Sequence, residues 1–188
     1  MIEHPPSHPA HPHLGGNIHF CVSCGSNLDY RIWSKGDGTM QLCCSSSKCN
    51  HVHFLDPKVA AGVIPTIDGK AIILQRAYNP GKGLWTFPGG FVNRGEIVSE
   101  AAIREAKEEA GGDVRAGKLL GVYSFQDNPT ILIVYTGEVI GGVPRALDES
   151  TDIHFVGPDE ILFEELAFDT TRAAFRDWQA WISSGQSL

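Results

Sequence analysis

The stretch GGFVNRGEIVSEAAIREAKEEAGG, residues 89–112, decides how the rest of the chain is interpreted. Two glycines and a short polar loop lead into residues 99–110, where apolar residues recur at helical spacing before a second pair of glycines. Residues three and four apart share a helix face, so Glu105, Glu108 and Glu109 would be neighbours. Because like charges at this spacing destabilise a helix, the crowding indicates that a side chain or a metal ion of positive charge lies beside these carboxylates.

A divalent cation suits such a cluster. Mg²⁺ prefers oxygen ligands, keeps several of its waters and bridges to phosphate, and it neutralises a diphosphate and activates water. Arg104 is adjacent to the cluster and can pair with one glutamate through two hydrogen bonds, while Glu96 can tie the loop to the start of the helix. A solvated helix face is the alternative, and it would account for the run EAKEEA taken alone.

The complete spacing resembles the Nudix box, the signature motif of Nudix hydrolases. The matching positions are Gly90, Glu96, Arg104, Glu105, Glu108, Glu109 and Gly111. Two positions depart from the motif: Ala106 is a small apolar residue, and Gly112 replaces an aliphatic one, so we expect Val114 to supply the packing behind the helix end. The resemblance covers residues 57–183 and implies an α/β fold, the Nudix α/β/α sandwich with a mixed sheet.

The resemblance also implies roles for the residues of the motif. Nudix hydrolases cleave a nucleoside diphosphate linked to another group, by attack of water on phosphorus. The implied ligands of Mg²⁺ or Mn²⁺ are Glu105, Glu109, Glu108 and the backbone carbonyl of Gly89 or Gly90. Glu108 is alternatively the base that orients water, and Arg104 would orient the cluster.

Hydrophobic patterning around the motif predicts the remaining elements. Apolar and alternating runs predict strands at 58–67, 70–77, 85–87, 118–125, 130–140 and 150–157. Residues 169–183 predict an amphipathic helix with Asp169 as its N-cap. This order of strands and helices favours a mixed sheet with helices on both faces.

The five cysteines of the chain all fall within residues 21–49. Cys21 and Cys24, followed by a glycine, have the spacing of a zinc knuckle, and a second pair follows at a separation suited to a four-thiolate zinc ribbon. Cys49 is one member of that second pair. Zinc with four protein ligands has no open position, so such a site would be structural.

The partner of Cys49 is left open by the spacing. Cys44 is favoured over Cys43, and replacement of one cysteine by His51 or His53 is a further alternative. A set of buried thiols without metal is the remaining interpretation, since free cysteine often lies in protein cores.

These features divide the chain into three parts. Residues 1–16 are rich in proline and histidine and are expected to form a disordered tail. Residues 17–54 are expected to form the zinc ribbon, and residues 55–188 the Nudix hydrolase domain.

A zinc ribbon before a Nudix domain resembles two groups of Nudix hydrolases. The NADH pyrophosphatases have a downstream SQPWPFPxS motif, which the run SFQDNPT after Tyr123 fails to match at most positions. The run FEELAFDTTRAAF, residues 163–175, resembles the plant-type FAD and ADP-ribose pyrophosphatases. An acidic loop of that group corresponds to ALDESTDIHF, so Glu149 is a candidate extra ligand or general base. The implied products are AMP and a second phosphate.

Three further side chains are candidates for substrate binding. Trp85 and Phe87 flank the first glycine pair and can stack on an adenine or isoalloxazine ring, with core packing as the alternative. Arg76 follows an apolar strand and can clamp a phosphate, with a surface salt bridge as the alternative.

The composition of the chain excludes some classes of binding partner. A formal net charge of −7 argues against non-specific nucleic-acid binding, and no apolar run is long enough to cross a bilayer. The N-terminal residues lack the features of a secretory signal, so we expect a cytoplasmic protein, and we expect a homodimer. The rival hypothesis is a catalytically inactive Nudix and zinc-ribbon module that senses a nucleotide or binds a regulator; the intact glutamate cluster argues against it.

Overall fold

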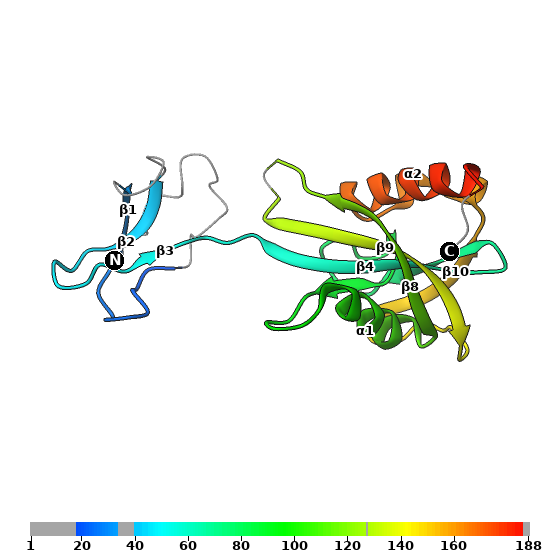
Figure 1. Ribbon diagram of the computed structural model, residues 1–188, viewed down its shortest axis with the longest axis horizontal. Coiled ribbons are helices and arrows are strands. Elements are labelled where there is room, and N and C mark those ends of the chain that lie inside the picture. Colours follow the sequence, from blue (N-terminus) through cyan, green and yellow to red (C-terminus); the bar gives the residue numbers. More distant parts are fainter. Residues whose placement is uncertain (1–17, 34–39, 127, 186–188) are drawn as a thin grey trace. The chain divides into compact units, whose positions relative to one another are not determined.

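The computed structural model describes residues 18–33, 40–126 and 128–185, so the tail expected at residues 1–16 lies outside the described residues. The chain divides into two compact units, Met1–Pro57 and Lys58–Leu188 (Figure 1). No helix among the described residues is long and apolar enough to span a membrane.

The N-terminal unit is built on a small antiparallel sheet in the order β1-β2-β3. Its strands are β1 (Leu28–Ile32), β2 (Met40–Cys44) and β3 (Val52–His53). Successive side chains of a strand point to opposite faces, and Leu42 and Cys44 accordingly share a small buried cluster with Leu28 and Cys21. Cys43, between them, points to the other face of the sheet.

The C-terminal unit contains a seven-stranded sheet and two α-helices. The strands are β4 (Lys58–Ile67), β5 (Lys70–Arg76), β6 (Trp85–Thr86), β7 (Gly89–Phe91), β8 (Asp113–Tyr123), β9 (Thr130–Gly141) and β10 (Ser150–Val156). The helices are α1 (Val98–Ala110), α2 (Asp169–Ser183) and the short 3₁₀ helices η1 (Pro158–Glu160) and η2 (Phe163–Glu165).

The sheet is mixed. Its order is β10-β5-β4-β9-β8, with β6 paired to β5 and β7 paired to β4. The pairing of β4 with β9 is parallel, whereas the other strand pairs are antiparallel.

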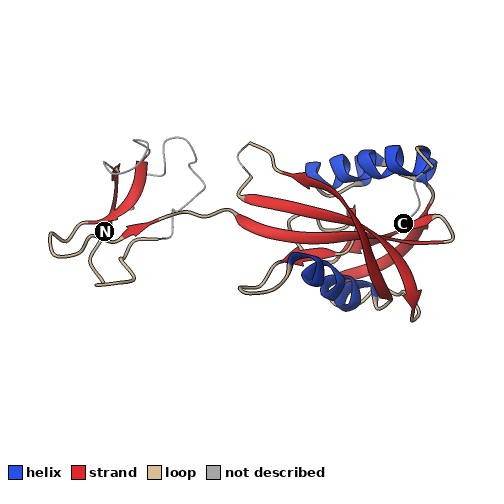
Figure 2. Cartoon of the chain, in the orientation of Figure 1, coloured by secondary structure: helices blue, strands red, loops and turns tan. Residues whose placement is uncertain are grey.

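The two α-helices cover opposite faces of this sheet (Figures 1 and 2). Alternation along β4 explains the arrangement, because Ala61 and Val63 pack in the cluster that contains the alanines of α1. Ile64, on the other face, packs with Phe175 and Trp178 of α2. The expected α/β/α sandwich with a mixed sheet is therefore confirmed.

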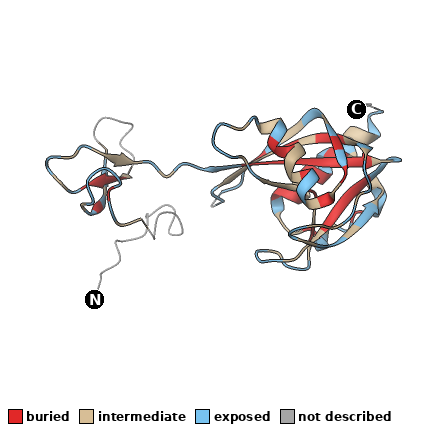
Figure 3. Ribbon diagram, turned by 90° about the horizontal axis from the view of Figure 1, so that it is seen from below, coloured by how far each residue is buried: buried red, intermediate tan, exposed pale blue. Residues whose placement is uncertain are grey.

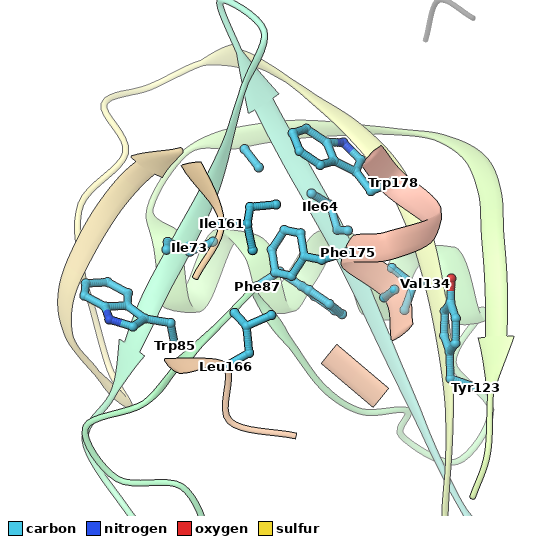
Figure 4. Packing of buried hydrophobic residues seen from close by; sticks show 12 residues of the cluster. Ile64, Ile73, Trp85, Phe87, Tyr123, Val134, Ile161, Leu166, Phe175 and Trp178 are labelled. Atoms are coloured by element: carbon cyan, nitrogen blue, oxygen red, sulfur yellow. The ribbon is translucent and has the colours of Figure 1, made fainter. Parts of the chain in front are cut away.

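The larger core lies between the sheet and α2, where buried segments of several strands and the helix meet (Figure 3). Phe175 and Trp178 are fully buried there (Figure 4). Val114, at the start of β8, is 7% exposed and packs in the α1 cluster with Ala106. It thus supplies the packing expected from it behind the end of the Nudix-type helix.

One local prediction is wrong. Asp169 is the first residue of α2 and not its N-cap, which is Phe168, and this cap has no side-chain hydrogen bond. The Asp169 carboxylate instead accepts a hydrogen bond of 3.0 Å from Arg172, three residues later in the same helix. The Asp169 side chain therefore neutralises the charge of Arg172 and does not accept a hydrogen bond from the free backbone amides of the first turn.

Candidate functional site

Two glycines bring the sheet close to the carboxylates of α1. Gly90, in β7, faces Glu105 so closely that a Cβ on it would lie 2.5 Å from the carboxylate. The neighbouring Gly89 amide donates a hydrogen bond of 3.0 Å to Glu109. Because β7 is paired to β4, opposite Ala61 and Gly62, this close approach is fixed by the sheet itself. A side chain at position 90 would push the helix away.

Arg104 is the positive partner that the crowded carboxylates require. Its Nε and Nη2 atoms donate to the two oxygens of Glu96 at 2.7 and 3.2 Å, a two-pronged ion pair. Its Nη1 donates to Glu105 at 2.7 Å and to Glu108 at 3.0 Å. One guanidinium therefore organises three carboxylates, rather than the single one expected from the sequence.

Glu96 connects the loop between β7 and α1 to the middle of the helix. Its second oxygen also accepts a hydrogen bond of 2.8 Å from the Asn93 amide. The hydrogen bonds from Arg104, followed by that from Asn93, lower the pKa of Glu96 to about 2. These contacts hold the loop against α1 at Arg104, rather than at the helix start as anticipated.

Glu109 has a different environment. Burial raises the pKa of its carboxyl to about 7, opposed by the hydrogen bond from Gly89, and the charges of Glu105 and Glu149 raise it further while Arg76 lowers it. Burial likewise raises the pKa of Glu105. Desolvated carboxylates that repel one another are stabilised in their ionised form by a nearby cation.

The donor set of α1 fits Mg²⁺ or Mn²⁺. Glu105, Glu108 and Glu109 offer only oxygen atoms, the ligands that these hard cations prefer. The three side chains are not gathered around one point, because Glu105 and Glu108 share Nη1 of Arg104 whereas Glu109 accepts from the Gly89 amide. Such an open arrangement suits an ion that keeps waters and shares phosphate oxygens as ligands.

The loop between β9 and β10 docks on the end of α1. The amides of Arg145 and Leu147 each donate, at 2.9 Å, to the carbonyls of Ala110 and Glu109. Further along, the carbonyl of Glu149 accepts a hydrogen bond of 2.8 Å from Ala77, just past the end of β5. These backbone bonds place Glu149 between the acidic helix and the loop that follows β5.

Arg76 stands at the end of β5, beside that loop. Its Nε donates to the carbonyl of Pro80 at 2.8 Å, and its guanidinium lies 5.0 Å from the ring centre of Phe168. In the part of the chain that the structure describes, no carboxylate lies within ion-pair distance of Arg76, so the alternative of a surface salt bridge is not supported. Phe168 lies in the run FEELAFDTTRAAF, but the sequence predicted no role for it.

Trp85 and Phe87 do not offer a stacking surface. They are 9% and 3% exposed and belong to the core beneath α2 (Figure 4). Trp85 packs against the imidazole of His154 with ring centres 4.3 Å apart, and Phe87 meets Phe175 edge-on at 5.6 Å. The prediction that they stack on a substrate ring is therefore corrected to core packing, since neighbouring side chains cover both.

The N-terminal unit gathers a second group of candidate ligands. The Sγ atoms of Cys21, Cys24, Cys44 and Cys49 all lie within 4.8 Å of one another. Two of the separations are 3.4 Å, between Cys24 and Cys44, and 3.9 Å, between Cys21 and Cys49. Tetrahedral zinc with Zn–S bonds of about 2.3 Å requires sulfur atoms about 3.8 Å apart, so the cluster fits zinc.

Local backbone structure forms this cluster. Gly25, with a positive φ of 74°, closes the turn after Cys24 by donating a hydrogen bond of 2.8 Å to the Cys21 carbonyl. Hydrogen bonds from Ser26 lower the pKa of Cys24 to about 6. Cys43 lies outside the cluster, as do His51 and His53, so the structure brings together the set favoured by the sequence.

Comparison with known proteins places the fold and the acidic helix in one family. The family model of the NUDIX domain matches residues 56–179. The chain belongs to the Nudix family. An ADP-ribose pyrophosphatase of Methanocaldococcus jannaschii is 39% identical over 132 residues, which cover 68% of this chain and 76% of the relative.

The chain is also similar to two further proteins, at lower sequence identity over the matched residues. The crystal structure of a NUDIX hydrolase from Nitrosomonas europaea superposes with a TM-score of 0.82 at 29% identity, covering 90% of this chain and 94% of the other. A NAD-capped RNA hydrolase of Stutzerimonas stutzeri is 24% identical over 123 residues, which cover 65% of this chain and 42% of the relative. Together with the motif of α1, these similarities agree with membership of the Nudix family.

Proposed function

We propose that this Nudix protein hydrolyses an ADP-ribose-type or FAD-type substrate, a nucleoside diphosphate linked to a second group, with Mg²⁺ or Mn²⁺. The observation that carries the proposal is the half-buried Glu109, which shares the face of α1 with Glu105 and Glu108 and touches the sheet through Gly89. The relation to the ADP-ribose pyrophosphatase of M. jannaschii favours that substrate class.

The metal would be held by Glu105, Glu108, Glu109 and a carbonyl of Gly89 or Gly90. Bound there, it supplies charge neutralisation for the diphosphate and a water of lowered pKa. Arg104 keeps the carboxylates in place through its hydrogen bonds to Glu105 and Glu108.

Residues at the edge of the site bind the substrate and accept the proton. Arg76, whose guanidinium forms no ion pair with a carboxylate of the described residues, contacts a phosphate oxygen of the substrate. Glu149 or Glu108 accepts a proton from the attacking water, whose oxygen bonds to phosphorus as the bond from phosphorus to the bridging oxygen breaks. The products are AMP and the phosphate ester of the second group.

The cysteine cluster is proposed to hold one structural zinc ion. Four thiolates leave zinc without an open coordination position, so the ion would stabilise the N-terminal unit and take no part in hydrolysis. In this proposal Cys21, Cys24, Cys44 and Cys49 are the ligands, and the buried Cys43 is a packing residue.

A product screen tests the proposal. The zinc-loaded protein is incubated with ADP-ribose, FAD, NADH and a nucleoside triphosphate, each with Mg²⁺ or Mn²⁺, and the products are separated by chromatography. We expect AMP from ADP-ribose or FAD at a higher kcat/KM than from NADH. Preferred cleavage of the triphosphate, or of NADH, would contradict the proposed substrate class.

A further inference from the structure

Arg172, in the first turn of α2, forms hydrogen bonds through its guanidinium with the segment that precedes the helix. Its Nε donates to the Phe163 carbonyl at 3.0 Å and its Nη2 to the Leu166 carbonyl at 2.6 Å. Its Nη1 donates to the Asp169 carboxylate at 3.0 Å. Two of these bonds tie residues 163–166 to the helix, and the third lies within the first turn of the helix itself.

This segment is also joined to the strand that leads into the site. Leu166 is 1% exposed and forms a parallel bridge with Trp85, and the Ala167 amide donates to the Trp85 carbonyl at 2.8 Å. The methyl group of Ala167 lies 3.1 Å from the position that a Cβ on Gly81 would occupy. Ala167 therefore packs closely against the loop between β5 and β6.

The contact chain ends at Arg76. The Cδ of Arg76 lies 3.5 Å from the same point above Gly81, and the Arg76 guanidinium lies over Phe168. The amide of the next residue, Ala77, donates a hydrogen bond to the Glu149 carbonyl in the loop between β9 and β10. In the same loop, the Leu147 amide donates to the Glu109 carbonyl. The segment fixed by Arg172 is thus continuous, through Arg76 and its neighbours, with the end of the acidic helix.

We propose that Arg172 is a positioning residue, which holds Phe168 and, through it, the Arg76 guanidinium where a substrate phosphate binds. This inference rests on the proposed function of Arg76. Arg172 does not touch the carboxylates of α1, so its loss affects substrate binding more than the chemical step. The planar guanidinium directs donors to separate acceptors at once, whereas a lysine ammonium is a single point charge.

Steady-state kinetics with ADP-ribose and Mg²⁺ test the proposal through Arg172→Ala and Arg172→Lys. We expect Arg172→Ala to raise KM about tenfold while kcat changes by less than about threefold, with only partial recovery in Arg172→Lys. Arg176→Ala is the matched control, because Arg176 is an exposed arginine of the same helix whose guanidinium lies 5.3 Å from the Phe163 ring centre and forms no hydrogen bond or ion pair with the described residues. A fall in kcat with unchanged KM would overturn the proposal.

A double-mutant cycle tests whether Arg172 acts through Arg76. If it does, adding Arg172→Ala to Arg76→Ala raises KM little further, because the guanidinium that it positions is already absent. Independent, multiplying effects of the two substitutions would contradict that route.

Amide hydrogen exchange without substrate separates this proposal from the proposed function. We expect Arg172→Ala, but not Arg176→Ala, to speed exchange in residues 76–84 and at Ala167, while exchange in α1 and the melting transition stay close to those of the unsubstituted protein. This result is independent of which nucleotide is cleaved. Unchanged exchange in residues 76–84 would overturn the positioning role even if ADP-ribose proved to be the substrate.

Discussion

The two units of this protein both present candidate metal ligands, but in opposite ways. In the N-terminal unit four sulfur atoms converge to within 4.8 Å of one another, held there by tight turns and a small sheet. In the C-terminal unit the carboxylates of α1 are divided between two partners: Glu105 and Glu108 both accept from Nη1 of Arg104, and Glu109 accepts from the Gly89 amide.

In the proposed function, this difference distinguishes a metal site that stabilises its unit from a metal site that takes part in hydrolysis. A closed set of four protein ligands leaves no room for a substrate, whereas spread carboxylates need water and phosphate oxygens to complete a coordination shell. Arg104 offsets the repulsion between Glu105 and Glu108 through one donor atom, while Glu109 is held separately by the Gly89 amide.

The largest effect is expected from breaking the closed site. Cys44→Ser should abolish zinc binding and unfold the N-terminal unit, because structural zinc contributes about 10–16 kcal/mol of apparent binding free energy to such domains. Cys43→Ser is the control, since Cys43 points to the other face of β2. Metal analysis should find about one zinc per chain in the control and none in Cys44→Ser; zinc in both variants would refute the ligand set.

Removing one charge from the open site should stop the chemistry and spare the fold. Glu109→Gln is expected to lower kcat on the order of 10³-fold, as for the loss of a group that acts at the reacting centre. Glu100→Gln removes the same charge from an exposed position of the same helix and should leave kcat nearly unchanged. Turnover by Glu109→Gln at the original rate would refute the metal assignment.

A smaller effect concerns pH and stability without Mg²⁺. Because the pKa of Glu109 is raised to about 7 in the folded protein, its contribution to stability is fully present below the unfolded value of about 4.5 and is lost as pH rises through 7. Glu96, with its pKa lowered to about 2, acts oppositely, and its contribution is lost only as pH falls from about 4.5 towards 2.

Thermal denaturation between pH 6 and 8 measures the effect of Glu109. The difference in melting temperature between the unsubstituted protein and Glu109→Gln should shift in favour of Glu109→Gln as pH rises, because only Glu109 ionises. Added Mg²⁺ should raise the melting temperature of the unsubstituted protein more at pH 8 than at pH 6. An effect of Mg²⁺ that is equal at both pH values would argue against ionised Glu109 as a ligand.

The smallest effects concern how firmly the end of α1 is fixed. Gly111 has a φ of 70°, and a Cβ on it would lie 3.0 Å from Leu147, so Gly111→Ala should lower stability by about 1 kcal/mol or more. At Gly112 the nearest atom would be an ordinary contact at 3.5 Å, and Gly112→Ala should raise stability by about 0.4–1 kcal/mol. Chemical denaturation measures the free energy of unfolding of each variant. Equal changes in Gly111→Ala and Gly112→Ala would contradict the backbone geometry described for these two positions.

Much of the fold follows from hydrophobic pattern. The apolar run of β4 and the amphipathic run of α2 were predicted with the bounds that the structure shows, because both bury continuous apolar surface. Strand β7 was not predicted, because Gly-Gly-Phe has no strand pattern of its own and is held in place by pairing with β4. The start of β8 was missed for a similar reason, since residues 113–117 depend on pairing with β9.

The site was predictable where its geometry is local. Arg104 and the glutamates of α1 belong to one helix, so their spacing specifies their proximity. Contacts between distant segments gave no such signal, and the pairing of Arg76 with Phe168 depends on packing across about 90 residues of chain. The burial of Trp85 against His154 and Leu166, and the choice between Cys43 and Cys44, likewise depend on tertiary structure.

Direct measurement of Mn²⁺ binding tests the central claim, that the acidic face of α1 binds divalent metal. Zinc-loaded protein is titrated with Mn²⁺ and the free ion is followed by electron paramagnetic resonance. We expect saturable Mn²⁺ binding that Glu100→Gln retains and Glu109→Gln loses. Equal binding by all three proteins, or no binding by the unsubstituted protein with or without substrate, would contradict the claim.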